Sequence, residues 1–149
     1  MKRILLAEDN PNDVELTLTA LRECHLANEV VVVHDGVEAL DYIYRRGAHC
    51  NRDPELPAVM LLDLKMPRID GLEVLKQIKS DPGLRRLPIV MLTSSREEHD
   101  LVRSYDYGVN AFVVKPVDFQ QFVEAIRNLG IFWAIVNEVP GVHIEPIGK

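Results

Sequence analysis

Five short apolar runs separated by amphipathic stretches constrain the fold of this chain more than any other feature. Almost every side chain is apolar in residues 3–7, 30–33, 58–62, 89–92 and 111–114. Strands that are apolar at successive positions are covered on both faces, which is typical of parallel sheets. The stretches between them have helical character, at residues 12–24, 37–46, 72–80, 97–107 and 118–132. This alternation predicts an α/β fold with right-handed crossovers.

The ends of the helices also carry signals. Asn10 or Asn12 could cap the first helix, and Asp118 could cap the last. Apolar residues recur along the last helix at three- and four-residue steps. We expect them to form one buried stripe, made of Phe119, Phe122, Ile126, Leu129 and Trp133.

Length and composition exclude several classes of protein. A chain of 149 residues fits one domain, and 47% hydrophobic with 27% charged residues is typical of a globular protein. The net charge of −6 argues against nucleic-acid or anionic-membrane partners. No apolar run is long enough to span a bilayer, and acids interrupt the N-terminal run before it could resemble a signal peptide. Cys24 and Cys50 form no framework, so we expect two reduced thiols in a cytoplasmic protein.

Charged or hydroxyl side chains follow four of the five predicted strands. Glu8 and Asp9 follow the first, Asp63 the third, Thr93 the fourth and Lys115 the fifth. In open α/β sheets, ligands bind outside the carboxyl ends of the strands. Asp63 alone could be a turn residue, but together these side chains predict one shared site.

The residue types suggest the chemistry of that site. Three clustered carboxylates repel one another, and oxygen ligands in a partly solvated site suit Mg²⁺. Lys115 and Thr93 are poor metal ligands and suit an anion instead, as a point charge and a hydroxyl donor. An Asp carboxylate can act as a nucleophile, so Asp63 with these partners describes a site that forms an aspartyl phosphate.

Four segments carry a resemblance to a known family. In order, "LLAEDN", "VMLLDLKMPRIDGLEVLKQIK", "PIVMLTSS" and "GVNAFVVKP" resemble the receiver domains of response regulators in two-component signalling. The resemblance implies a (βα)5 flavodoxin-like fold, a doubly wound parallel sheet with strand order 2-1-3-4-5. On this basis we expect residues 1–136 to form the receiver domain and residues 137–149 a C-terminal tail.

The resemblance also assigns a phosphoryl acceptor and a metal site. It implies that Asp63 accepts a phosphoryl group from a phosphohistidine on a partner kinase. It implies that Asp9 and Asp63 bind Mg²⁺ through their carboxylates and Lys65 through its backbone carbonyl. Glu8, which replaces the commoner Asp, would act mainly through a metal-bound water.

Further roles are implied on the fourth and fifth strands. Thr93 would reach the phosphoryl group, Lys115 would pair with it, and the Lys115–Pro116 bond would be cis. Phe112 occupies the position of the family's aromatic switch, although it could equally be a packed core residue without that role. Lys65 and Ser95, each two places after a site residue, lie where the family tunes hydrolysis of the acyl phosphate.

The C-terminal segment "GIFWAIVNEVP" contains more apolar surface than one face of a helix can bury, which favours an interface. Together with "SYDYGVN", it resembles the single-domain response regulators that partner bacterial phytochromes. That resemblance implies a light-regulated histidine kinase as partner and a homodimer built on helix four, strand five, helix five and the tail. Leu101, Val102, Tyr105 and Tyr107 could contribute to this face.

Three other functions compete with a terminal phospho-switch. The chain could be a phosphorelay intermediate, and the sequence does not separate these two signalling roles. A small aspartate-nucleophile phosphatase would place an acid two residues after the nucleophile, where this chain has Lys65. A flavodoxin-like FMN binder would need a Ser-, Thr- or Gly-rich loop after the first strand, where this chain has the acidic "EDNPND". We therefore expect a signalling switch and not an enzyme.

Overall fold

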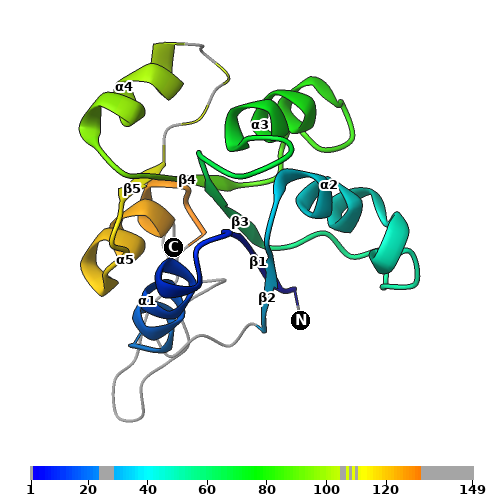
Figure 1. The fold of residues 1–149 in the computed structure, drawn as a ribbon, viewed down its shortest axis with the longest axis horizontal. Helices are drawn as coiled ribbons and strands as arrows, with labels where there is room; N and C mark the ends of the chain where they lie inside the picture. Colours follow the sequence, from blue (N-terminus) through cyan, green and yellow to red (C-terminus); the bar gives the residue numbers. More distant parts are fainter. Residues whose placement is uncertain (1, 24–28, 105–106, 108, 110, 132–149) are drawn as a thin grey trace.

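Five parallel strands in the order β2-β1-β3-β4-β5 form a single sheet (Figure 1). The computed structural model describes residues 2–23, 29–104, 107, 109 and 111–131. The strands are β1 (Ile4–Ala7), β2 (Val30–Val33), β3 (Val59–Asp63), β4 (Ile89–Thr93) and β5 (Phe112–Val114). The helices are α1 (Pro11–Glu23), α2 (Gly36–Tyr44), the short 3₁₀ helix η1 (Gly47–His49), α3 (Gly71–Ser80), α4 (Arg96–Ser104) and α5 (Phe119–Asn128). The predicted flavodoxin-like fold and strand order are confirmed.

Helices cover both faces of the sheet, as the all-apolar strands predict (Figure 1). On one face, α2, α3 and α4 pack over a core that includes Leu75 and Met91. On the other face, α1 and α5 pack over a core that includes Leu6 and Phe122. Successive side chains of the central strands β1, β3 and β4 enter opposite cores, so these strands are buried along their length, whereas the edge strands β2 and β5 are only partly buried.

The carboxyl ends of the central strands lie at one edge of the sheet. β3 and β4 each extend one residue further than the sequence predicted, so that Asp63 and Thr93 are the last residues of their strands. Asp63 pairs with Leu92 in register, and the backbone N–H of Lys115 donates to the Thr93 carbonyl at 2.7 Å. The ladder therefore fixes the backbone from which these side chains project.

Side-chain caps begin the helices next to this edge. Asn10 Oδ1 accepts from the backbone N–H groups of Asn12 and Asp13, at 2.8 and 3.2 Å. Asp118 Oδ1 accepts from the backbone N–H of Gln121 at 2.8 Å. Both predicted cap positions are thus confirmed, with Asn10 rather than Asn12 as the first cap.

The last helix is shorter than the sequence predicted. α5 ends at Asn128, and Gly130 follows with a φ of 73°, a conformation that ends helices. Phe122 and Ile126 are fully buried as expected, but Phe119 is 41% exposed and does not belong to the buried stripe. Trp133 and the tail at residues 137–149 lie outside the described residues.

The expected interface residues on α4 divide between surface and core. Leu101 is 47% exposed, whereas Val102 is 1% exposed and packs in the core beneath α4. Val102 therefore cannot contribute to the expected interface as predicted, because the helix turns it toward the sheet. Tyr107 is half-buried against the same core, and Tyr105 lies outside the described residues.

The remaining expectations concern the membrane and the cysteines. Among the helices of the described part of the chain, none has the length and apolarity that a bilayer crossing requires. Cys50 is exposed and its thiol is free, and Cys24 lies outside the described residues.

Gly71 lets α3 begin directly against the end of β3. Its N–H donates to the Leu64 carbonyl at 2.8 Å, and a Cβ at this position would overlap the carbonyl oxygen of Asp63. A side chain at Gly71 would therefore push apart α3 and the backbone that carries Asp63.

We predict that Gly71→Ala lowers the free energy of unfolding by about 1–3 kcal/mol, because the added methyl group has no space. Urea unfolding followed by circular dichroism measures the change. Gly83→Ala is the matched control, since the nearest atom to its Cβ would be Asp81 Oδ1 at an ordinary 3.4 Å. Equal losses in the two variants would contradict the proposed close approach.

Candidate functional site

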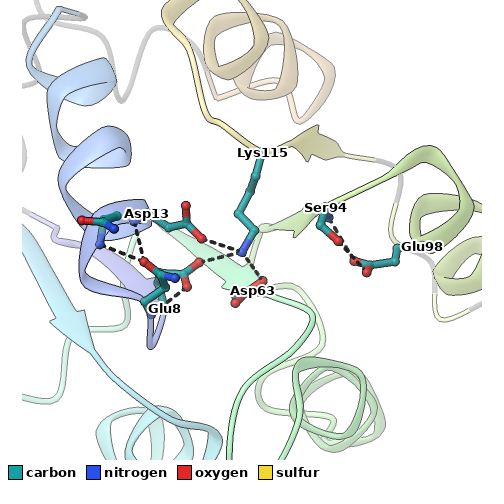
Figure 2. A network of polar contacts seen from close by, with 8 residues as sticks. Glu8, Asp13, Asp63, Ser94, Glu98 and Lys115 are labelled. Carbon is teal, nitrogen blue, oxygen red and sulfur yellow. Dashed lines mark hydrogen bonds and ion pairs between the residues drawn. The ribbon is translucent and has the colours of Figure 1, made fainter.

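The ammonium group of Lys115 lies at the centre of an acidic cluster at the carboxyl edge of the sheet (Figure 2). Its Nζ lies 3.1 Å from Asp63 Oδ1, 3.1 Å from Asp13 Oδ2 and 3.3 Å from Glu8 Oε2. Lys115 reaches this position from the end of β5, and the bond to Pro116 is cis, as the resemblance implied. Charged side chains from the ends of three strands and from the first turn of α1 therefore meet at one point.

Two of the three carboxylates in contact with Lys115 are shielded from solvent. The side chains of Glu8 and Asp63 are 0% and 4% exposed. Burial raises the pKa of Glu8 to about 7, because the buried charged form loses its hydration and also faces Asp63. Burial likewise raises the pKa of Asp63, while the Lys115 ammonium opposes that change. For Lys115 itself, burial acts to lower the pKa, but Asp63 and Glu8 outweigh it and the pKa rises. The ammonium therefore opposes the effect of burial on both carboxyl groups, although the pKa of each stays raised.

Asp9 completes a set of oxygen ligands on the open side of the cluster. Carboxylate oxygens of Glu8, Asp9 and Asp63 all lie within 4.8 Å of one another, and Asp9 is exposed. All three offer hard oxygen donors, and the exposed side leaves room for water ligands, which Mg²⁺ retains in proteins. The donor set fits the expected Mg²⁺ site. These residues and Lys115 line a shallow pocket of about 240 Å³.

The opposite wall of the pocket is built by the start of α4. Glu98 Oε1 accepts the backbone N–H of Ser94 at 3.0 Å, and Glu98 Oε2 accepts the Ser94 hydroxyl at 2.6 Å (Figure 2). Lys65 Nζ lies 3.2 Å from Glu98 Oε2, although the Lys65 side chain is 79% exposed. Lys65 thus points along the pocket rim toward α4, and its side chain does not join the acidic cluster.

Thr93 is at the predicted edge, but its hydroxyl does not line the pocket. The residue is fully buried, and its Oγ1 has no hydrogen-bond partner among the described residues. An unpartnered buried hydroxyl is costly. Reaching a group bound at Asp63 requires the side chain to turn toward the pocket, where it would gain a partner.

Sequence reasoning missed Asp13 and Glu98 as site residues. Asp13 lies in the first turn of α1, directly after the loop that carries Glu8 and Asp9, and this position could have placed it beside the cluster. Glu98 follows Ser95 by three residues, which is the spacing of a capping box. Both signals are short and common, so neither distinguishes a site residue from an ordinary helix start.

Residues 4–127 match the model of the response regulator receiver domain. The chain belongs to this family. Among the solved structures, it is 64% identical to "the bacteriophytochrome response regulator AtBRR", with a TM-score of 0.88 and coverage of 93% of this chain and 99% of that one. It is 59% identical to "Bacteriophytochrome response regulator RtBRR", with a TM-score of 0.88 and coverage of 95% and 85%. Among curated proteins, it is 35% identical to response regulator Rcp1 of Synechocystis over 139 residues, 93% of each chain.

Receiver domains bind Mg²⁺ through acidic residues, and the raised pKa of Glu8 predicts how that binding depends on pH here. Between its ordinary pKa of 4.5 and the folded value of about 7, Glu8 binds more protons in the folded than in the unfolded state. Its contribution to the free energy of unfolding is therefore lost as pH rises through this window. Mg²⁺ prefers the ionised carboxylates, so it should offset the loss.

We predict that Mg²⁺ raises the Tm more at about pH 8 than at about pH 5.5, because protons compete with the metal at low pH. Differential scanning fluorimetry with and without Mg²⁺ measures the shift at each pH. Glu8→Gln removes one titrating group, so the pH dependence of the shift should shrink. The same shift at both pH values in the unaltered protein would argue against a metal at this cluster.

Proposed function

We propose that this receiver domain is a phosphorylation-controlled signalling switch in which Asp63 accepts a phosphoryl group from a phosphohistidine on a sensor kinase. The observation that carries the proposal is the environment of the Asp63 carboxylate. It lies at the end of a central strand, 3.1 Å from the Lys115 ammonium and beside two further acids. A carboxylate with a fixed cation and a metal-binding set next to it suits phosphoryl transfer.

The transfer itself needs few protein groups. An oxygen of Asp63 attacks phosphorus, the phosphorus–nitrogen bond to the imidazole breaks, and the imidazole nitrogen keeps the electron pair. Lys115 lies within ion-pair distance of the attacking carboxylate, where it can stabilise the negative charge on the transferred oxygens. Thr93 would then turn its hydroxyl toward the new phosphoryl group and gain the partner that it lacks.

Asp9 and Asp63 are the proposed carboxylate ligands for Mg²⁺, with the backbone carbonyl of Lys65 as a third ligand. Glu8 is more deeply buried and would contribute through a metal-bound water. When bound, Mg²⁺ would supply positive charge that offsets the charge of the phosphoryl oxygens.

The position of Lys65 supports a switch over an enzyme. A phosphatase of the aspartate-nucleophile type needs an acid/base group two residues after the nucleophile. Here Lys65 occupies that position and pairs with Glu98 at 3.2 Å. We infer that the chemistry stops at phosphorylation of Asp63 and its slow hydrolysis.

The names of the relatives suggest the partner. Two solved structures with 59% and 64% identity are named bacteriophytochrome response regulators. We therefore propose a bacterial phytochrome histidine kinase as the phosphodonor, acting in the cytoplasm. We further propose that residues 1–136 form the receiver unit, and that the tail at residues 137–149 joins α4, β5 and α5 in a homodimer interface.

We predict that Asp63→Asn abolishes labelling by a phosphorylated histidine kinase or by acetyl phosphate, because the amide is no nucleophile. Phosphate incorporation measured by intact mass spectrometry gives the stoichiometry, and EDTA should block the reaction in the unaltered protein. Asp13→Asn is the matched control, since Asp13 also contacts Lys115 at 3.1 Å but should not accept phosphate. Stoichiometric labelling of Asp63→Asn would remove Asp63 as the acceptor.

We also predict that deleting the residues after Gly130 weakens self-association, because the deletion removes the apolar segment that we propose to lie in the interface. Sedimentation velocity with and without phosphorylation measures the effect. Leu101→Ser on α4 should weaken association in the same way, whereas Leu16→Ser on α1 should not, although the two leucines are 47% and 48% exposed. A protein that stays monomeric at high concentration in both states would exclude the dimer.

A further inference from the structure

Glu98 forms more contacts at the pocket than the start of a helix requires. In a capping box, the carboxylate of the third helical residue accepts the backbone N–H of the cap residue itself. Ser95 is in the cap position, and its Oγ accepts the Glu98 N–H at 3.3 Å. The Glu98 carboxylate, however, accepts both the N–H and the hydroxyl of Ser94, the residue before the cap.

The Glu98 carboxylate also makes a third type of contact, an ion pair. Glu98 Oε2 lies 3.2 Å from Lys65 Nζ, so one carboxylate holds a backbone donor, a hydroxyl donor and an ammonium. The Glu98 side chain is only 14% exposed. Its pKa is lowered, because the donors of Ser94 and the charge of Lys65 outweigh burial. The group is therefore an anion that is fixed in place.

The fixed anion lines the pocket into which Asp63 opens. Asp63, Lys65, Ser94 and Glu98 all belong to the walls of this pocket of about 240 Å³. A phosphoryl group on Asp63 would bring further negative charge into the same small volume. Like charges at this range repel, and the local dielectric, lower than that of water, strengthens the repulsion.

We propose that Glu98 is a positioning residue that occupies the anion-binding donors of Ser94 and Lys65 until a phosphoryl group on Asp63 displaces it. The proposal rests on the proposed function, because it needs a phosphoryl group at Asp63. A phosphoryl group offers acceptors to the same N–H, hydroxyl and ammonium, and it carries more charge than a carboxylate. Displacement frees Glu98 on the first turn of α4, so the event at β3 is passed to that helix by a single side chain.

Glu98 should therefore oppose phosphorylation. With acetyl phosphate as donor, an oxygen of Asp63 forms a bond to phosphorus, and acetate leaves with the electron pair of the broken phosphorus–oxygen bond. Glu98→Gln removes the repelling charge, and Glu98→Ala also removes the acceptor that engages Ser94. We expect both variants to be phosphorylated about three- to tenfold faster, the effect of one partly screened charge.

Two comparisons separate this role from a general effect of the substitutions. Glu73→Gln is the matched control, because Glu73 is the third residue of α3, carries the same charge and lies outside the pocket walls. Its rate should equal that of the unaltered protein. The advantage of Glu98→Gln should shrink at about 1 M salt, because salt screens the repulsion between Glu98 and the phosphate donor that approaches from solvent, and a purely structural role would not produce this change.

The outcomes are distinct. Rates of Glu98→Gln and Glu98→Ala within twofold of the unaltered protein, or an equal increase in Glu73→Gln, would overturn the displacement by phosphate while leaving Asp63 as acceptor. Absence of labelling in the unaltered protein itself would overturn the proposed function, and the role of Glu98 with it. Thermal unfolding of each variant checks that the compared proteins are folded.

Discussion

The ion pair between Lys115 and the buried carboxylates is the interaction on which the rest of the site depends. Parallel strands in this order bring the ends of β1 and β3 side by side, so Glu8 and Asp63 meet where little water reaches them. Two buried carboxylates without a cation would take up protons, and a protonated Asp63 would be a poor nucleophile. The Lys115 ammonium reaches this pair from the end of β5 and acts to lower the pKa of both carboxyl groups against the effect of burial, so the site needs the fifth strand.

Much of this arrangement follows from the sequence, because it depends on the period and order of the elements. All-apolar strands demand cover on both faces, and residues that follow such strands share one edge. The association of Glu8, Asp9, Asp63 and Lys115 was predictable on that basis. The extra strand residues at Asp63 and Thr93 were not, because hydrogen bonding of the ladder and not side-chain type decides where a strand ends.

The errors share a different cause, which is orientation within a single helical turn. Leu101 and Val102 are neighbours in sequence, yet Val102 is buried and Leu101 is exposed. Two adjacent apolar residues do not reveal which of them faces the core. Asp13 and Glu98 join the site because their helices begin at a particular rotation beside the strand ends. The end of α5 could have been predicted, because glycine commonly ends helices and Gly130 has the required positive φ. The apolar residues beyond Gly130 suggested a longer helix instead.

The two walls of the pocket respond differently to added charge. On the β1 side, Lys115 is 16% exposed and contacts carboxylates that are almost fully buried, and breaking such a pair leaves an uncompensated buried charge. On the β4 side, Glu98 is held by Ser94 and by the exposed Lys65, and exposed ion pairs contribute little to stability. An additional anion at Asp63 would therefore move the weaker wall first. In the proposed switch, the change is therefore expected at α4 and not at α1, because Lys65 beside Glu98 is 79% exposed whereas the Glu8 and Asp63 carboxylates beside Lys115 are almost fully buried.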